Sequence, residues 1–285
     1  RASAILTGFF ALTVPLMPVQ AVLVRVSPKA ARRFPNWYHR QVCRLMGITL
    51  NIEGSVAHDV PVLLVCNHTS WLDIPVLSAL APLSFVAKKE VGGWPFVASL
   101  ARLQRTVFID RNKRQAAGDA ADEISGRLAS GDTIVLFAEG TSSDGNRVLP
   151  FKTLLFSAVK GGSPSPSKAV VQTAAVVYTH VHGVPLLRAD RPRVAWFGDM
   201  EMQSHAWGVL KGGPLSVTIR VSPPVPLETF VGRKDLALTS ERTVRKAVLG
   251  ILRGRPEDDI QPVEPDETRR RLRLPTATIS NEKWT

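Results

Sequence analysis

The sequence contains few cysteines. Cys43 and Cys66 are the two cysteines among 285 residues. This number excludes a small secreted fold held by several disulfides, and it excludes a zinc module built on clustered cysteines. The histidines His180 and His182 have no third ligand near them in the sequence. We therefore predict no metal site. Because the cysteines are so few, we expect a reducing compartment.

Acidic residues are also scarce. The chain has 24 Asp and Glu against 36 Lys and Arg, a formal net charge of +12 at pH 7. Such a charge suits nucleic acid, an anionic membrane surface, an acidic protein or a plain solvated surface. Nucleic-acid binding would call for a helix-turn-helix or a sheet rich in exposed aromatics, and the sequence indicates neither, so we expect no nucleic-acid partner. The hydrophobic content of 45% excludes an intrinsically disordered chain.

Charge is absent from residues 2–24, which are long enough for a helix of roughly 34 Å against a hydrocarbon core of about 30 Å. Pro15 and Pro18 argue against a straight helix, so we expect a kinked span or a segment within one leaflet. The alternative is a secretory signal, because residues 19–21 resemble a cleavage site. The basic stretch 25–44 would hinder export, and it would attract anionic lipid head groups from the cytoplasmic side.

The middle of the chain alternates between strand and helix patterns. This alternation predicts an α/β fold with a mixed central sheet flanked by helices, preceded by an N-terminal membrane-associated helical segment. The expected strands are 61–66, 106–109, 133–138, 170–178 and 215–221, and the expected helices are 71–80, 94–103, 113–130 and about 238–253. Thr239 or Ser240 would suit the N-cap of the last helix. We expect three parts: the membrane-associated segment with its basic stretch (1–48), the α/β domain (49–253) and a mobile charged tail (254–285).

A histidine and an aspartate follow the first of these strands, in the segment NHTSWLD at 67–73. His68 and Asp73 would point about 140° apart in a regular helix, but a loop-to-helix junction can bring them together. Asp73 could then accept a hydrogen bond from one imidazole nitrogen and leave the other free to take a proton. No G-x-S-x-G motif of a serine hydrolase occurs. The alternative interpretation is a capped helix with a surface histidine.

A second polar segment, EGTSSDG at 139–145, follows the strand expected at 133–138. Its glycines let a ligand approach the backbone, and its hydroxyl and amide groups could hold a polar head group. The alternative is an ordinary Gly-Asp-Ser turn.

The two segments together resemble the glycerolipid acyltransferase family, which includes 1-acylglycerol-3-phosphate acyltransferases. The first family motif matches at His68 and Asp73. The second matches at 105–111 (RTVFIDR), and the third, usually FPEGTRS, matches at 137–143 (FAEGTSS). The segments FVAKKEVGGWPF, LFAEGTSSDGNRVLPFKTLLF and VVYTHVHGVP are similar to the lyso-ornithine-lipid O-acyltransferase branch. The resemblance covers roughly residues 25–225.

The sequence departs from the family pattern in three places. Ser142 replaces the usual arginine, which removes a fixed cation from the third motif. Ala138 replaces the usual proline, and the proline of the fourth motif is missing at 171–175, so that motif carries over only as a strand. Arg111 and Lys152 could still supply positive charge to a phosphate acceptor.

The resemblance implies a membrane enzyme that acylates the free hydroxyl of a lyso-ornithine lipid. His68 would be the general base and Asp73 would orient it, and the acceptor would be bound by Arg111, Glu139, Gly140, Thr141 and Ser142. The acyl donor would be a thioester of acyl carrier protein or coenzyme A, with no metal or tightly bound cofactor. An acidic carrier protein would suit the basic residues Lys88, Lys89, Arg102, Arg105, Lys113 and Arg114.

The resemblance also implies a location and leaves two alternatives. The expected place is the inner membrane, with the catalytic domain on the cytoplasmic face and an anionic lipid surface beside it. One alternative is an acyltransferase that uses 1-acyl-sn-glycerol-3-phosphate, alone or in addition. The other is a noncatalytic lipid-binding module with the same fold.

Overall fold

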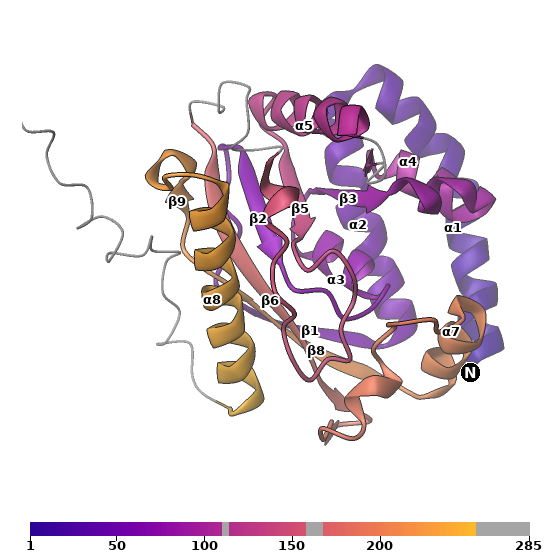
Figure 1. Ribbon diagram of the computed structural model, residues 1–285. Helices are drawn as coiled ribbons and strands as arrows, with labels where there is room; N and C mark the ends of the chain where they lie inside the picture. Colours follow the sequence, from indigo (N-terminus) through magenta and orange to yellow (C-terminus); the bar gives the residue numbers. More distant parts are fainter. Residues whose placement is uncertain (110–113, 158–167, 255–285) are drawn as a thin grey trace, which may run out of the picture.

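A mixed sheet forms the centre of the molecule, as the sequence predicted (Figure 1). The computed structural model describes residues 1–109, 114–157 and 168–254. The strand order is β1-β8-β6-β2-β5-β3-β4, and two short strands, β7 and β9, pair with β6. On this path β8 is antiparallel to β6, and the other neighbours are parallel. The strands are β1 (Ile48–Glu53), β2 (Val62–Cys66), β3 (Ser84–Lys88), β4 (Val107–Ile109), β5 (Thr133–Phe137), β6 (Val170–Val181), β7 (Val184–Pro185), β8 (Leu215–Val221) and β9 (Val225–Pro226).

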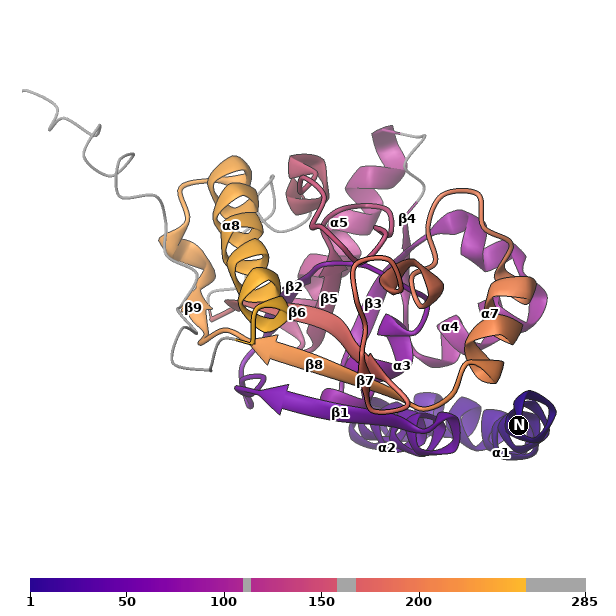
Figure 2. The same cartoon turned by 90° about the horizontal axis from the view of Figure 1, so that it is seen from below.

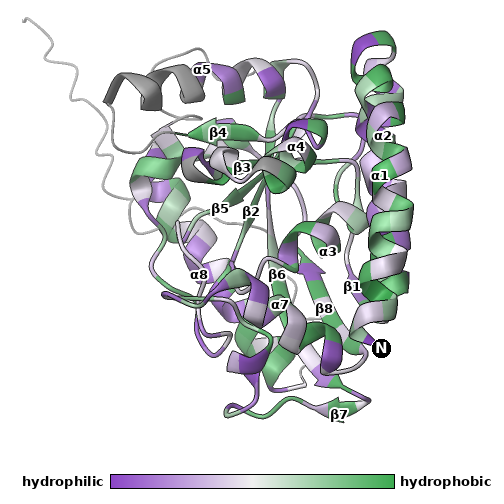
Figure 3. Ribbon diagram, turned by 90° about the vertical axis from the view of Figure 1, so that its right-hand side faces the viewer, coloured by the Kyte–Doolittle hydropathy of each residue, from purple (hydrophilic) through white to green (hydrophobic). Residues whose placement is uncertain are grey.

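Both faces of the sheet are buried. Along β2, Val62 and Leu64 belong to one hydrophobic core while Leu63 and Val65 belong to another, because successive side chains point to opposite faces. Helices α2 and α3 lie on the first face, with α1 packed beside α2, and helices α5 and α8 lie on the second (Figures 2 and 3). The helices are α1 (Ala2–Val26), α2 (Pro28–Met46), α3 (Asp73–Leu80), α4 (Pro95–Leu103), α5 (Arg114–Ala129), α7 (Met202–Lys211) and α8 (Arg233–Leu252).

Helix α1 continues through Pro15 and Pro18. Within the described residues it is the one helix that is long and apolar enough to cross a membrane, a test that a signal sequence also passes. Only 11% of its most apolar window is buried, so most of this apolar surface faces outward. The side chain of Gln20 ties the helix to the protein by donating to the carbonyls of Ala31 and Leu103, at 3.0 and 2.9 Å.

The structure corrects the expected start of the last helix. Helix α8 begins at Arg233, and Thr239 and Ser240 are buried within it. Its first turn is held by Asp235, which accepts a hydrogen bond from the Val231 amide at 3.1 Å. This hydrogen bond joins the first turn of the helix to the chain before it, so the helix does not begin at the N-cap expected at Thr239 or Ser240. Strands β1 and β3 and helix α7 were not predicted, and the tail 255–285 lies outside the described residues.

Candidate active site

The histidine motif and the glutamate motif meet at one edge of the sheet. Strands β2 and β5 are parallel neighbours, and Cys66 at the end of β2 lies opposite Phe137 at the end of β5. The residues that follow these two strands therefore lie side by side, although they are far apart in the sequence. Oε1 of Glu139 accepts a hydrogen bond from the backbone N–H of His68 at 2.8 Å.

Asn67 fixes where the histidine loop leaves the sheet. Its side-chain amide donates to the Val176 carbonyl at 2.9 Å and accepts from the Val176 N–H at 2.8 Å. This exchange imitates the backbone pairing of β2 with β6 for one more residue. The position of His68 is therefore set from both sides, by Asn67 on one side and by Glu139 on the other.

Asp73 folds the loop back toward its own helix. Its Oδ2 accepts hydrogen bonds from the backbone N–H groups of Thr69 at 2.7 Å and Ser70 at 3.0 Å. The same oxygen lies 2.8 Å from Nδ1 of His68. Asp73 is fully buried, and its other oxygen accepts from the hydroxyl of Tyr178 at 2.8 Å. The structure thus brings His68 and Asp73 together at the loop-to-helix junction.

The imidazole of His68 is held but not enclosed. Its ring stacks on Phe137 with centroids 4.1 Å apart, and 19% of its side chain is exposed. When Nδ1 carries the hydrogen and donates it to Asp73, Nε2 keeps its lone pair. Within the described part of the chain Nε2 has no hydrogen-bond partner. This geometry leaves one basic nitrogen available to a substrate hydroxyl.

Two neighbouring groups stay in one protonation state. Burial and the negative charge of Asp73 raise the pKa of the Tyr178 hydroxyl well above its usual value, so this hydroxyl remains a donor. Burial, and to a lesser degree Asp73, raises the pKa of the Cys66 thiol well above its usual range. Cys66 is fully buried and protonated, which makes it a packing residue and not a nucleophile.

Glu139 serves the backbone of two loops. Its second oxygen accepts from the N–H of Leu149 at 2.7 Å, and the residue is 1% exposed. Burial raises the pKa of its carboxyl to about 7, against the lowering effect of the two N–H donors. Glu139 therefore joins the histidine loop to the segment that follows the third motif.

The other residues predicted to bind the acceptor differ in burial and in hydrogen bonding. Gly140 is buried with φ +71°, a conformation that suits glycine, and Thr141 is exposed. The hydroxyl of Ser142 donates to the carbonyl of Trp196, which ties the third motif to a distant loop. Arg111 lies outside the described residues.

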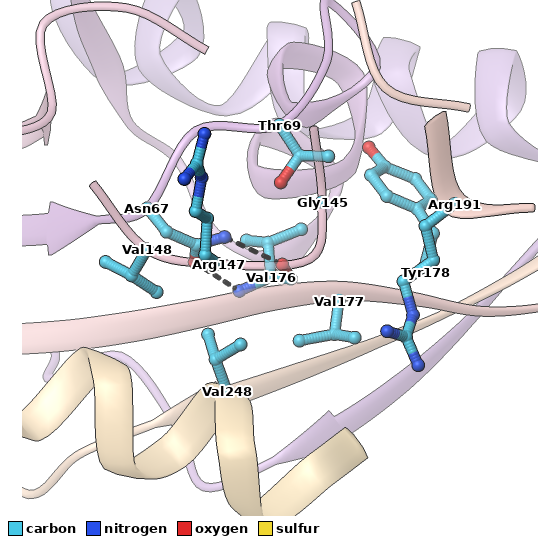
Figure 4. A pocket seen from close by; sticks show the side chains of 10 residues that line it. All are labelled: Asn67, Thr69, Gly145, Arg147, Val148, Val176, Val177, Tyr178, Arg191 and Val248. Carbon is cyan, nitrogen blue, oxygen red and sulfur yellow. Dashed lines mark hydrogen bonds between the residues drawn. The ribbon is translucent and has the colours of Figure 1, made fainter. Parts of the chain in front are cut away.

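A small pocket lies next to the histidine segment (Figure 4). Asn67 and Thr69, on either side of His68, form part of its wall together with Tyr178. Two further residues line it, Arg147 and Arg191. No role was predicted for Tyr178, Arg147 or Arg191, because they come from separate segments and only the fold brings them to one place. Tyr178 gave one signal, a polar hydroxyl within an apolar strand.

The charged residues around the site form no metal centre that can be described. Within the ranges that the structure describes, no three His, Cys, Asp or Glu side chains are grouped as metal ligands.

Of the basic residues expected to face a carrier protein, Lys88 and Arg102 are exposed, but Arg105 is bound to Asp132 at 2.9 Å. Lys113 and the side chain of Arg114 lie outside the description.

Known proteins share this sequence and fold. Residues 48–177 match the acyltransferase family. A lyso-ornithine lipid O-acyltransferase from Brucella abortus is 43% identical over 90% of this chain and 96% of its own length. One from Rhizobium meliloti is 41% identical, over 84% and 83%. A 1-acyl-sn-glycerol-3-phosphate acyltransferase from Neisseria meningitidis is 34% identical over 66% of each chain.

A solved structure shares the fold at lower identity. It is the 1-acyl-sn-glycerophosphate acyltransferase from Thermotoga maritima, with a TM-score of 0.62 and 22% identity over 86% of this chain and 94% of that one. The motifs recognised in the sequence, the mixed sheet that carries them and the long alignments agree. The chain belongs to the acyltransferase family.

Proposed function

We propose that this chain is a lyso-ornithine lipid O-acyltransferase, which moves a fatty acyl group from a thioester to the free hydroxyl of a lyso-ornithine lipid. The observation that carries the chemistry is the uncommitted Nε2 of His68, on a ring whose Nδ1 lies 2.8 Å from the buried Asp73. The acceptor is supported by the names of the relatives that are 43% and 41% identical.

The reaction follows from this pair. Nε2 of His68 removes the proton of the acceptor hydroxyl while its oxygen attacks the thioester carbonyl carbon. Asp73 stabilises the imidazolium that forms, because its carboxylate already accepts the Nδ1 hydrogen. The tetrahedral intermediate collapses, the carbon–sulfur bond breaks, and the imidazolium returns the proton to the leaving thiolate. The products are the ester and the free thiol.

The acyl donor is proposed to be acyl carrier protein or coenzyme A. The exposed Lys88 and Arg102 support an acidic carrier, since unlike charges speed the encounter of two proteins. Arg105 gives less support, because its guanidinium is engaged by Asp132.

The site is proposed to act at the inner membrane from the cytoplasmic face. The apolar surface of α1 and the basic residues of α2 support this, because an apolar helix beside lysines and arginines suits an anionic lipid surface. Residues 1–48 would be the membrane-facing part, although Ile5, Val42 and Cys43 share the core of the α/β domain. The domain boundary at residue 48 is thus a functional division proposed within one packed body.

A transfer assay with the full chain in liposomes tests the proposal. Labelled acyl carrier protein or acyl-coenzyme A is offered with lyso-ornithine lipid, and separately with 1-acyl-sn-glycerol-3-phosphate. We expect ester formation on the lyso-ornithine lipid that is lost in His68→Ala. Ester formation on the phosphate acceptor alone would establish the second candidate, which the 34% identical Neisseria relative supports. Lipid binding without transfer to either acceptor would support a noncatalytic lipid-binding module.

A further inference from the structure

The loop 144–148 closes over the pocket beside His68. Gly145 has φ +77°, and a Cβ on it would lie 3.2 Å from Cγ2 of Thr69 and 3.5 Å from Cβ of Arg191. The loop is therefore held in close contact with both segments, and glycine is needed for this approach. Nη1 of Arg191 donates to Oδ1 of Asn146 at 3.0 Å, which fixes the residue next to Arg147.

Arg147 and Arg191 flank this pocket on opposite sides, with Thr69 and Gly145 between them (Figure 4). Arg147 is exposed and comes from the loop, whereas Arg191 is partly buried and begins the short helix η3 (Arg191–Arg193). The view places the guanidinium of Arg147 on the side of Asn67, the residue before His68. Arg147 is thus the cation nearer to the histidine segment.

Neither arginine has an acidic partner in the described part of the chain. Nε of Arg191 is buried without a hydrogen-bond partner there, and Arg188 adds positive charge close to it. The neighbouring Arg193 differs, because it pairs with Asp190 at 3.4 Å and its side chain is 81% exposed. A pocket edged by unpaired arginines attracts an anion, which a guanidinium binds through two parallel hydrogen bonds.

The rest of the pocket offers no competing cation and no free acid. Apart from the two arginines its lining consists of uncharged residues: Asn67, Thr69, Gly145, Tyr178 and four valines. Lyso-ornithine lipid carries a carboxylate on its ornithine head group, only a few bonds from the hydroxyl to be acylated. An anchor for that carboxylate beside His68 would place the hydroxyl near Nε2.

We propose that Arg147 binds the carboxylate of the ornithine head group and that Arg191 is a positioning residue, which holds Arg147 in place through Asn146. The proposal rests on the proposed function. Arg147 then contributes to acceptor binding and to the choice of acceptor, whereas proton transfer stays with His68.

The test compares the acceptor with its neutral analogue. Wild type, Arg147→Gln and Arg147→Lys are assayed on lyso-ornithine lipid and on its α-carboxamide. Arg193→Gln is the matched control, since it removes an equal charge from the adjacent segment. We expect Arg147→Gln to raise KM for lyso-ornithine lipid by about 10- to 100-fold with kcat changed little, as for a lost charge-assisted hydrogen bond. The carboxamide should be a poor acceptor for wild type and equally poor for the variant, and Arg147→Lys should lie between.

Gly145→Ala tests the placement without removing a charge. The added methyl group should displace the loop from Thr69, and the KM for lyso-ornithine lipid should rise while the melting temperature shows that the protein is folded. An equal effect of Arg147→Gln on acid and amide acceptors, or no effect, would overturn the proposal. If wild type acylates only 1-acyl-sn-glycerol-3-phosphate, the proposed function fails. An increased KM for that phosphate in Arg147→Gln would then assign the residue to a phosphate, and an unchanged KM would refute the site altogether.

Discussion

The hydroxyl of Tyr178 donates to the oxygen of Asp73 that His68 does not use, at 2.8 Å. Tyr178 lies on β6 and Asp73 begins α3, so a strand next to the middle of the sheet holds the carboxylate of the helix. Among the described residues four hydrogen bonds reach the Asp73 carboxylate, and all come from groups fixed by the backbone or by packing. This support determines the orientation of the histidine ring.

Tyr178→Phe is therefore expected to weaken both folding and catalysis. Oδ1 of Asp73 would be buried with no donor, which costs about 1–3 kcal/mol. We expect kcat to fall by roughly 10-fold as His68 loses its fixed orientation. Tyr38→Phe is the matched control, because that hydroxyl pairs with Thr13 at 2.7 Å, away from the site. Thermal unfolding and acyl transfer measure the two effects, and equal behaviour of the two variants would contradict a positioning role.

His68→Ala tests the general base. We expect kcat to fall by about 10²- to 10⁴-fold, since the variant lacks the group proposed to take the hydroxyl proton. The side chain is partly exposed, so the melting temperature should change by only a few degrees. His58→Ala, at an exposed position, is the control. Full activity in His68→Ala would remove the histidine from the mechanism.

Much of the fold could be predicted because some of its strands are nearly continuous apolar runs. Strands β2 and β5 are buried on both faces, so every position except Thr133 at the start of β5 is apolar and the pattern is unambiguous. Strand β1 has a mixed burial pattern at the edge of the sheet, and β3 begins with Ser84 and ends with Lys88, so neither strand is a continuous apolar run that the sequence pattern would reveal.

The site was only partly accessible to sequence reasoning. His68 and Asp73 could be paired because they lie on one short segment whose turn is local. Tyr178 could not be added to them, since its contact with Asp73 joins residues 105 positions apart. Glu139 and Ser142 were expected to bind the acceptor. The sequence did not reveal that both side chains are already hydrogen-bonded to neighbouring backbone groups.

Glu139 gives a pH dependence of stability. Burial raises the pKa of its carboxyl from 4.5 in the unfolded chain to about 7 in the folded protein. The folded state therefore holds a proton that the unfolded state has lost between these values, and stability decreases as the pH rises through this window. Glu139→Gln does not titrate, so wild type should lose melting temperature relative to the variant between pH 5 and pH 8, by roughly 5 °C. Parallel curves for the two proteins would show that Glu139 is not buried as a titrating group.

Gln172 offers a test of the fold at a position outside the active site. Its side chain is fully buried on β6, where it accepts from the Ala57 amide at 2.7 Å and donates to the carbonyls of Ser55 and Ser222 at 3.0 and 2.6 Å. Gln172→Leu keeps the approximate volume but leaves three backbone groups without this partner. We expect a loss of about 3–5 kcal/mol, seen as a melting temperature lower by roughly 10 °C.

The same variant should leave the chemistry intact. Gln172 lies at the end of β6 away from Tyr178, so kcat per folded molecule should stay within about threefold of wild type. Gln203→Leu on α7 is the matched control, because that side chain is exposed and should change neither quantity. If Gln172→Leu unfolds no earlier than Gln203→Leu, the link from the β1–β2 connection through Gln172 to the end of β8 does not contribute to stability. If Gln172→Leu lowers kcat while the protein is fully folded, the change at Gln172 reaches Asp73 through β6 and Tyr178. The positioning of Asp73 by Tyr178 would then depend on the whole strand.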